Sequence, residues 1–128
     1  MFTADQLVAH AIGDYVLQSD CMSTEKTLRS LAPAFPIALY ILPFLFITQN
    51  PLTLAVIAGS HFVIDRWQLA RYVVWLKNRP WPGARPWSEC RKTGFAPEVP
   101  EWKAGWLLIV VDNILHVLAN GMAIHWIG

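Results

Sequence analysis

The chain contains few charged residues and few cysteines, and each shortage excludes a class of protein. Asp, Glu, Lys and Arg make up only 15% of the 128 residues, and the net charge is +1. Such a balance gives no support for a nucleic-acid-binding protein or for a strongly acidic partner. The two cysteines, Cys21 and Cys90, form no C-x-x-C motif and are too few for a disulfide framework. We therefore expect both to be free thiols.

Familiar catalytic motifs are also missing, and a cleavable leader is not expected. The sequence has no G-x-S-x-G, no H-E-x-x-H and no P-loop. Its first twenty residues contain Asp5, His10, Asp14 and Asp20 and no basic n-region, so a signal peptide is not expected. Any chemistry must come from side chains that are dispersed along the chain.

Apolar residues are abundant. They make up 55% of the chain, and the mean hydropathy is +0.36. Two uninterrupted apolar stretches are long enough to cross a bilayer, which takes about 20 residues. The sequence therefore predicts an all-α, polytopic membrane helical bundle, with residues 1–128 as a single membrane domain.

The segments of this bundle follow from helical periodicity. Three clear transmembrane helices are expected at about residues 28–49, 52–77 and 104–126. The first is expected to kink at Pro33, Pro36 and Pro43. Residues 4–22 repeat apolar positions at helical spacing but are too polar to face lipid all round, so they predict an inserted or re-entrant amphipathic helix. Residues 78–103 form a connection rich in Trp, Pro and charge.

Basic residues orient this arrangement. They gather at residues 23–30 and 78–103, which the positive-inside rule places in the cytoplasm. The polar turn at residues 48–51 and the C-terminus at Gly128 then face outward. Five tryptophans near the expected helix ends suit an interfacial aromatic belt: Trp75, Trp81, Trp87, Trp102 and Trp106.

The most informative pattern is a set of three His/Asp pairs, each four residues apart on an expected helix. The pairs are His10/Asp14, His61/Asp65 and Asp112/His116. A spacing of four puts an imidazole and a carboxylate on one helix face, one turn apart. Ionisable groups within membrane helices are costly and usually mark a site. The pattern therefore predicts a buried polar cluster.

The order within the pairs agrees with the expected topology. The helix that contains His61 runs inward and the helix that contains His116 runs outward, and the order of His and Asp is reversed between them. Asp65 and Asp112 then lie on the cytoplasmic side of their histidines, and Asp14 does so if residues 4–22 insert from outside. The two histidines also lie at similar depths, roughly 13.5 Å and 15 Å from the outer ends of their helices.

Three imidazoles and three carboxylates suit a borderline divalent cation, zinc first, with iron or manganese as alternatives. The expected ligands are His10, Asp14, His61, Asp65, Asp112 and His116. Bound zinc lowers the pKa of water toward about 7, and Asp14, Asp65 or Asp112 is expected to serve as the catalytic base. Gln18, Asn113 and Asn120 are close enough in sequence to orient ligands or a substrate's polar group.

A simpler interpretation of the pairs stays open. Each pair could be a local hydrogen bond that ties helices together in the bundle. His125 has no carboxylate partner at this spacing and is expected at the membrane interface. Arg66 and Arg71 are expected to snorkel to the cytoplasmic surface or to bind lipid phosphate.

The stretch His10-Ala-Ile-Gly13-Asp14-Tyr-Val-Leu-Gln18, followed by Met22 and Lys26, resembles the N-terminal motif of the domain of unknown function 3307 family. This family consists of small bacterial and phage integral membrane proteins, and it resembles the chain further in an H-x-x-x-D in a middle helix and a D-x-x-x-H in the last. The resemblance implies the bacterial inner membrane and supports the fold and the six residues, but it implies no reaction. A looser likeness to membrane-bound metal-dependent hydrolases depends on the His and Asp residues alone.

We therefore expect a metal-binding membrane protein that acts as a metal-dependent hydrolase on a lipid or lipid-linked substrate. One alternative is a proton-relay or transport module that works without metal. Another is a non-catalytic membrane interaction protein that uses residues 78–103. The expected partners are membrane lipid, a further copy of the chain or another membrane protein, and no nucleic acid.

Overall fold

The computed structural model describes residues 2–17 and 34–128, and every regular element in this part of the chain is a helix. The predicted all-α class is confirmed. The expected contributions of Gln18, Cys21 and residues 23–30 lie outside the described residues. The chain divides into two compact units, Met1–Trp67 with His116–Gly128 and Gln68–Leu115, which are described separately below. The single membrane domain stays a prediction.

The first unit begins with α1 (Ala4–Ala11), which continues as a π-helical turn, η1 (Ile12–Val16). Gln6, Ala9 and His10 recur at helical spacing and form the buried side of α1. The π turn follows His10 directly and contains Gly13. Turns of this kind are rare in helices and are frequent at functional sites.

The next helix of the first unit is α3 (Ala34–Ile41), which tightens into a 3-10 helix, η2 (Leu42–Phe46). Pro36 lies in the first turn of α3, where its missing N–H costs little. Pro43 lies at the start of η2, at the point where the α-helical geometry ends. The described part of the expected 28–49 segment is therefore two short helical pieces, because prolines interrupt its hydrogen bonding.

The third helix, α4 (Pro51–Trp67), has a well-defined start. The Asn50 side-chain oxygen accepts a hydrogen bond from the Leu52 N–H at 2.9 Å, and Pro51 occupies the first helical position. The Asn50 amide also donates to the Ile127 carbonyl at 3.0 Å, which ties this start to the C-terminal end of the chain. Thr53, Ile57, His61 and Ile64 form one buried stripe along α4.

The expected helix at 52–77 is wrong in its length. α4 ends at Trp67, Gln68 adopts a left-handed backbone with φ 48°, and α5 (Leu69–Asn78) begins after it. Neither glycine nor proline marks this break, so the sequence pattern gave no signal for it. The break coincides with the boundary between the two units, and α5 buries Ala70 and Val74 within the second unit.

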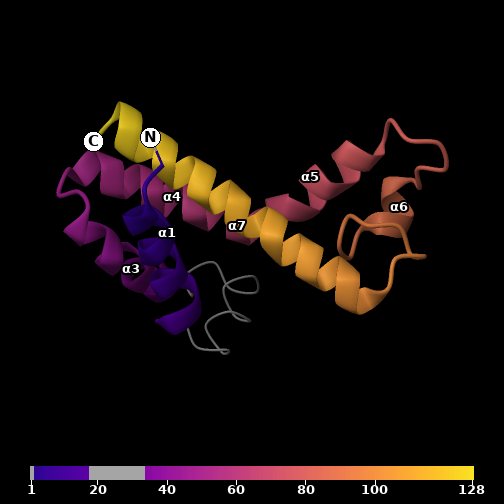
Figure 1. Ribbon diagram of the computed structural model, residues 1–128, viewed down its shortest axis with the longest axis horizontal. Coiled ribbons are helices and arrows are strands. Elements are labelled where there is room, and N and C mark those ends of the chain that lie inside the picture. Colours follow the sequence, from indigo (N-terminus) through magenta and orange to yellow (C-terminus); the bar gives the residue numbers. More distant parts are fainter. Residues whose placement is uncertain (1, 18–33) are drawn as a thin grey trace. The chain divides into compact units, whose positions relative to one another are not determined.

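The second unit joins α5, the short α6 (Trp87–Cys90) and the first part of α7 (Glu101–Trp126), as Figure 1 shows. Its core contains Val74, Phe95 and Ala104. Gly94 has φ +82°, and a Cβ atom there would overlap the Arg71 carbonyl oxygen. Burial raises the pKa of the Cys90 thiol, which is free as predicted.

The helix α7 is the one helix in the described part of the chain that is long and apolar enough to cross a membrane. α4 has 17 residues and the Phe35–Phe46 stretch is shorter still. Much of α7 is exposed and apolar: Trp102, Trp106, Ile109, Val110, Ile114 and Leu118. This face suits lipid contact, and the helix closely matches the expected segment 104–126.

A candidate metal centre of three histidines and a carboxylate

The buried stripe of α4 positions the centre of the site in the first unit. His61 is 1% exposed, and Asp65 follows it one turn later on the same face. The Asp65 carboxylate contacts two imidazoles. Its Oδ2 lies 3.1 Å from His61 Nε2, and its Oδ1 accepts a hydrogen bond of 3.1 Å from His116 Nε2. His116 comes from α7 and is fully buried, so two helices distant in sequence meet at one carboxylate.

The carboxylate constrains one of the two rings. A carboxylate accepts hydrogen bonds, so its bond with His116 favours a proton on Nε2 of that imidazole. The 3.1 Å contact with His61 Nε2 lacks hydrogen-bond geometry and does not assign the His61 proton. The His61 and His116 Nδ1 atoms lie 3.3 Å apart, facing each other in a buried setting. Two lone pairs this close repel, so a proton or a cation must lie between them.

Tyr40 of α3 packs against the His61/His116 pair. The side chain is fully buried, and its ring stacks on the His61 ring with centroids 3.8 Å apart and an interplanar angle of 15°. Its hydroxyl accepts a hydrogen bond of 2.7 Å from the Asn120 amide of α7. The hydroxyl has one proton, which it can donate to His10 Nδ1 at 2.8 Å.

His10 joins the cluster from α1. It is 4% exposed, and its ring centroid lies 5.4 Å from that of His116. Gly13, at the π turn, allows this approach. A Cβ atom at Gly13 would lie 2.7 Å from Tyr40 Cδ2 and 3.0 Å from the Tyr40 carbonyl oxygen. The glycine of the H-x-x-G-D pattern therefore lets α1 and α3 pack closely enough for His10 to reach Tyr40.

The structure thus brings His10, His61, Asp65 and His116 together. One donor atom from each of His61, Asp65 and His116 lies within 4.8 Å of the others, which makes these three a group able to hold a metal ion. Asn120 is 1% exposed, and its side-chain oxygen is buried without a hydrogen-bond partner among the described residues. That oxygen is available to a ligand or to an ordered water molecule.

Asp14 is also close to the cluster. It is half-buried in η1, and one of its carboxylate oxygens lies within 4.8 Å of a ring nitrogen of His116. Asp112 is half-buried on α7, one turn before His116, within the part of that helix that belongs to the second unit. The Asn113 amide donates to the Ile109 carbonyl of its own helix at 2.8 Å. His125 is exposed at the end of α7, and its expected place at the membrane interface stays a prediction.

The sequence interpretation missed Tyr40, and it named Asn120 only as a neighbour of His116. The Tyr40 hydroxyl hydrogen-bonds to both the Asn120 amide and His10 Nδ1, and so links the two to the cluster. The available signal was a single phenol in the apolar stretch around residues 35–46, because a buried tyrosine hydroxyl usually finds a hydrogen-bond partner.

Comparison with known proteins identifies the family of this chain. Residues 2–125 match the model of a family described as protein of unknown function, DUF3307. Comparison with curated proteins and with solved structures gives no match. The family match spans α1 and both His/Asp pairs of α4 and α7, as the H-x-x-G-D motif and the two later pairs predicted. The chain therefore belongs to the DUF3307 family, whose description names no activity.

Proposed function

We propose that the first unit binds a divalent cation, zinc in preference to iron or manganese, between the Nδ1 atoms of His61 and His116. The supporting observation is the 3.3 Å separation of these atoms, combined with one carboxylate behind both rings. Two nitrogen ligands of a tetrahedral zinc ion at about 2.0–2.1 Å lie about 3.3–3.4 Å apart. The residues therefore fit the ion.

Each neighbouring side chain has a distinct role in this proposal. Asp65 accepts a hydrogen bond from His116 Nε2 and contacts His61 Nε2, so it orients both imidazoles and raises their basicity, as outer carboxylates of histidine metal sites do. Tyr40 fixes the plane of the His61 ring by stacking on it. His10 Nδ1 accepts a hydrogen bond from the Tyr40 hydroxyl, which fixes the position of the His10 ring beside His116.

We further propose that the centre hydrolyses a lipid or a lipid-linked substrate. A divalent cation at this position supplies Lewis acidity and activates water for attack on an ester or a phosphoester. Asp14, half-buried in η1 with a carboxylate oxygen within 4.8 Å of a His116 nitrogen, is the proposed general base. Asp112 remains the alternative base, on α7. The Asn120 oxygen is positioned to accept a hydrogen bond from a bound group.

The cellular setting is part of the proposal. The chain would lie in the bacterial inner membrane with three transmembrane segments and the inserted N-terminal helix, and residues 78–103 would face the cytoplasm. The length and apolar surface of α7 support membrane association. Reporter fusions after residues 50, 90 and 128 test the topology. A cytoplasmic reporter signal at Gly128 would overturn the orientation.

Calorimetric titration of the chelator-treated full chain with zinc tests the metal site. The expected result is one site per chain, absent in His61→Ala and His116→Ala, weakened about 10–100-fold in Asp65→Asn, and unchanged in His125→Ala. His125 is the matched control, because it is the histidine at the exposed end of α7. Equal binding by all variants, or none by the natural chain, would refute the site.

Hydrolysis has its own test. The chain is reconstituted in vesicles of labelled bacterial lipid, and the products are separated by mass. Turnover should stop on chelation, return with zinc, and fall at least 100-fold in Asp14→Asn while zinc binding persists. Zinc binding without any product would remove the hydrolase and leave the metal site.

One observation favours the second candidate, a proton relay without metal. The Tyr40 hydroxyl is buried beside His61 and hydrogen-bonded to His10, while the Asn120 amide donates to the hydroxyl and orients it. The Tyr40 hydroxyl could pass a proton to His10 Nδ1, because both groups titrate. A pH-sensitive dye inside the same vesicles tests it. Proton entry that survives chelation and is lost in Tyr40→Phe would favour the relay over the hydrolase.

A further inference from the structure

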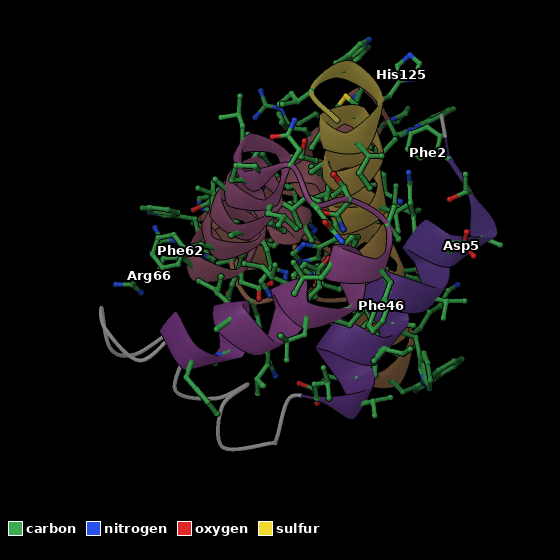
Figure 2. The ribbon with its side chains drawn as sticks, turned by 90° about the vertical axis from the view of Figure 1, so that its left-hand side faces the viewer. Phe2, Asp5, Phe46, Phe62, Arg66 and His125 are labelled. Atoms are coloured by element: carbon green, nitrogen blue, oxygen red, sulfur yellow. The ribbon has the colours of Figure 1, made fainter. Side chains whose placement is uncertain are left out.

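A groove of about 970 Å³ opens in the first unit between α1, η2 and the last turn of α7. Its walls include Ala9, Ile12, Leu42, Phe46 and Ile124. Figure 2 shows Asp5, Phe46 and His125 on the face turned toward the viewer. Sites for small ligands have volumes of about 300–1,000 Å³, so the groove has the size of a binding site.

The chemistry of the groove changes along its length. Thr3, Asp5 and His125 line the end where α1 begins and α7 ends. These helix ends lie together because the Phe2 ring packs against Gly121, which has no side chain to exclude it. Ile12 and Leu17, further along the chain, line the groove with purely apolar side chains. A ligand that fits this gradient has one polar end and one long apolar end.

The buried residues at the bottom of the groove also pack against the candidate metal centre. Gln6 and Ala9 line the groove and are 3% and 4% exposed, respectively. Gln6 precedes His10 by one helical turn on the same buried face of α1, a rise of about 6 Å. Ala9 packs in the core cluster that contains Tyr40. A ligand in the groove would therefore lie one layer of side chains from the histidines.

We propose that this groove holds the hydrocarbon chain of an amphiphile whose head group donates hydrogen bonds. The hydrocarbon chain of the ligand lies along Ile12, Leu42 and Phe46, and its head group lies at Thr3 and Asp5. Asp5 selects the head: a carboxylate attracts an ammonium or hydroxyl donor and repels a head whose only charge is negative. The inference rests on the proposed function in one respect, because it identifies this amphiphile as the substrate of the centre.

The exposure of residues along the groove supports lateral entry of the ligand's hydrocarbon chain. Phe46 is 95% exposed, and Val8 and Leu42 are about half exposed, so the apolar wall is open rather than sealed. An apolar surface of this kind on a membrane-associated chain suits an acyl chain that slides in from the bilayer. The polar end keeps the head at one end of α1.

Photocrosslinking tests the proposed site of the ligand's hydrocarbon chain. The full-length protein in nanodiscs is exposed to a lysophosphatidylethanolamine that carries a diazirine in its acyl chain, and labelled residues are mapped by mass spectrometry. We expect the label on Val8, Ile12, Leu42 and Phe46, with at least a fivefold loss in Val8→Trp, which fills the groove. Val63→Trp is the matched control, since Val63 is an exposed valine of α4. Equal labelling of both variants would overturn the proposal.

The head-group preference has a separate readout. Lysophosphatidylethanolamine should compete with the probe at least fivefold better than lysophosphatidic acid, and Asp5→Asn should abolish that difference. Equal competition in the natural chain would refute the selection by Asp5. Groove labelling does not require zinc. If the groove is labelled in a protein that binds no zinc, the groove is supported and the metal centre is refuted. If zinc binds and the groove residues stay unlabelled, the metal centre is supported and the groove is refuted.

Discussion

The two units of the chain treat polar side chains in opposite ways. In the first unit, His10, His61, His116 and Asn120 are buried and bonded to one another or to Tyr40 and Asp65. In the second unit, ion pairs such as Arg85–Glu98 and Lys92–Glu101 lie on the surface, and cations stack over rings. Buried polar groups are expensive unless satisfied, whereas exposed pairs contribute little. This difference supports our proposal that the site lies in the first unit.

The largest expected effect on stability concerns the buried contact between His116 and Asp65 in the first unit. His116→Ala removes one of the two imidazoles that face the Asp65 carboxylate. Breaking a buried pair by removing one partner costs about 3–5 kcal/mol, so the free energy of unfolding should fall by that amount. Unfolding in detergent, followed by circular dichroism, measures it. A loss no larger than that of His125→Ala would show that the buried pair does not stabilise the unit.

The second unit has its own sensitive position, but it depends on backbone packing. Gly94→Ala forces a Cβ atom onto the Arg71 carbonyl oxygen at a left-handed residue and should cost about 2–4 kcal/mol. Gly83→Ala is the matched control, because Gly83 has the same φ of +82° and open space around it. It should cost only the conformational strain, about 1–2 kcal/mol. Equal losses would contradict the packing at Gly94, and zinc binding should survive both changes.

A smaller effect tests the hydrogen bonds that surround the histidines. Tyr40→Phe keeps the ring stacked on His61 but leaves His10 Nδ1 and the Asn120 amide without the hydroxyl. Losing one partner of buried groups costs about 1–3 kcal/mol. Tyr72→Phe, in the second unit, is the control and should change the free energy of unfolding by less than this. Equal behaviour of the two variants would erase the distinction between the units.

The smallest effect concerns the surface of the second unit. A backbone hydrogen bond and then the Arg85 guanidinium hold the pKa of Glu98 below its ordinary value. The stabilisation is therefore present above the ordinary glutamate pKa of about 4.3 and is lost as the pH falls through the lowered value. Both groups are exposed, so Glu98→Gln should barely alter thermal unfolding at pH 6, followed by tryptophan fluorescence. A large change would contradict the small contribution that we expect from exposed ion pairs.

Much of the site could be predicted from spacing alone. Four-residue spacing placed His61 and Asp65 on one face, and the reversed order of Asp112 and His116 matched helices of opposite direction. The apolar length of 104–126 anticipated α7 within a few residues. These features are local, so a single sequence contains them.

The parts that could not be predicted depend on tertiary contacts. Nothing at Gln68 favours a left-handed residue, and the break appears because α5 packs within another unit. Tyr40 lies in a uniformly apolar stretch, where periodicity does not reveal which side faces the histidines. The role of Asp65 also changed in the interpretation: its two contacts with Nε2 atoms suggest an outer partner, where the sequence suggested a ligand.

X-ray absorption at the zinc edge of the purified full-length chain tests the central claim most directly. The account predicts one zinc ion per chain with two imidazole nitrogens at about 2.0–2.1 Å, and loss of that imidazole signal in His116→Ala. A chain that takes up no zinc, or zinc whose shell contains no imidazole nitrogen, would contradict it.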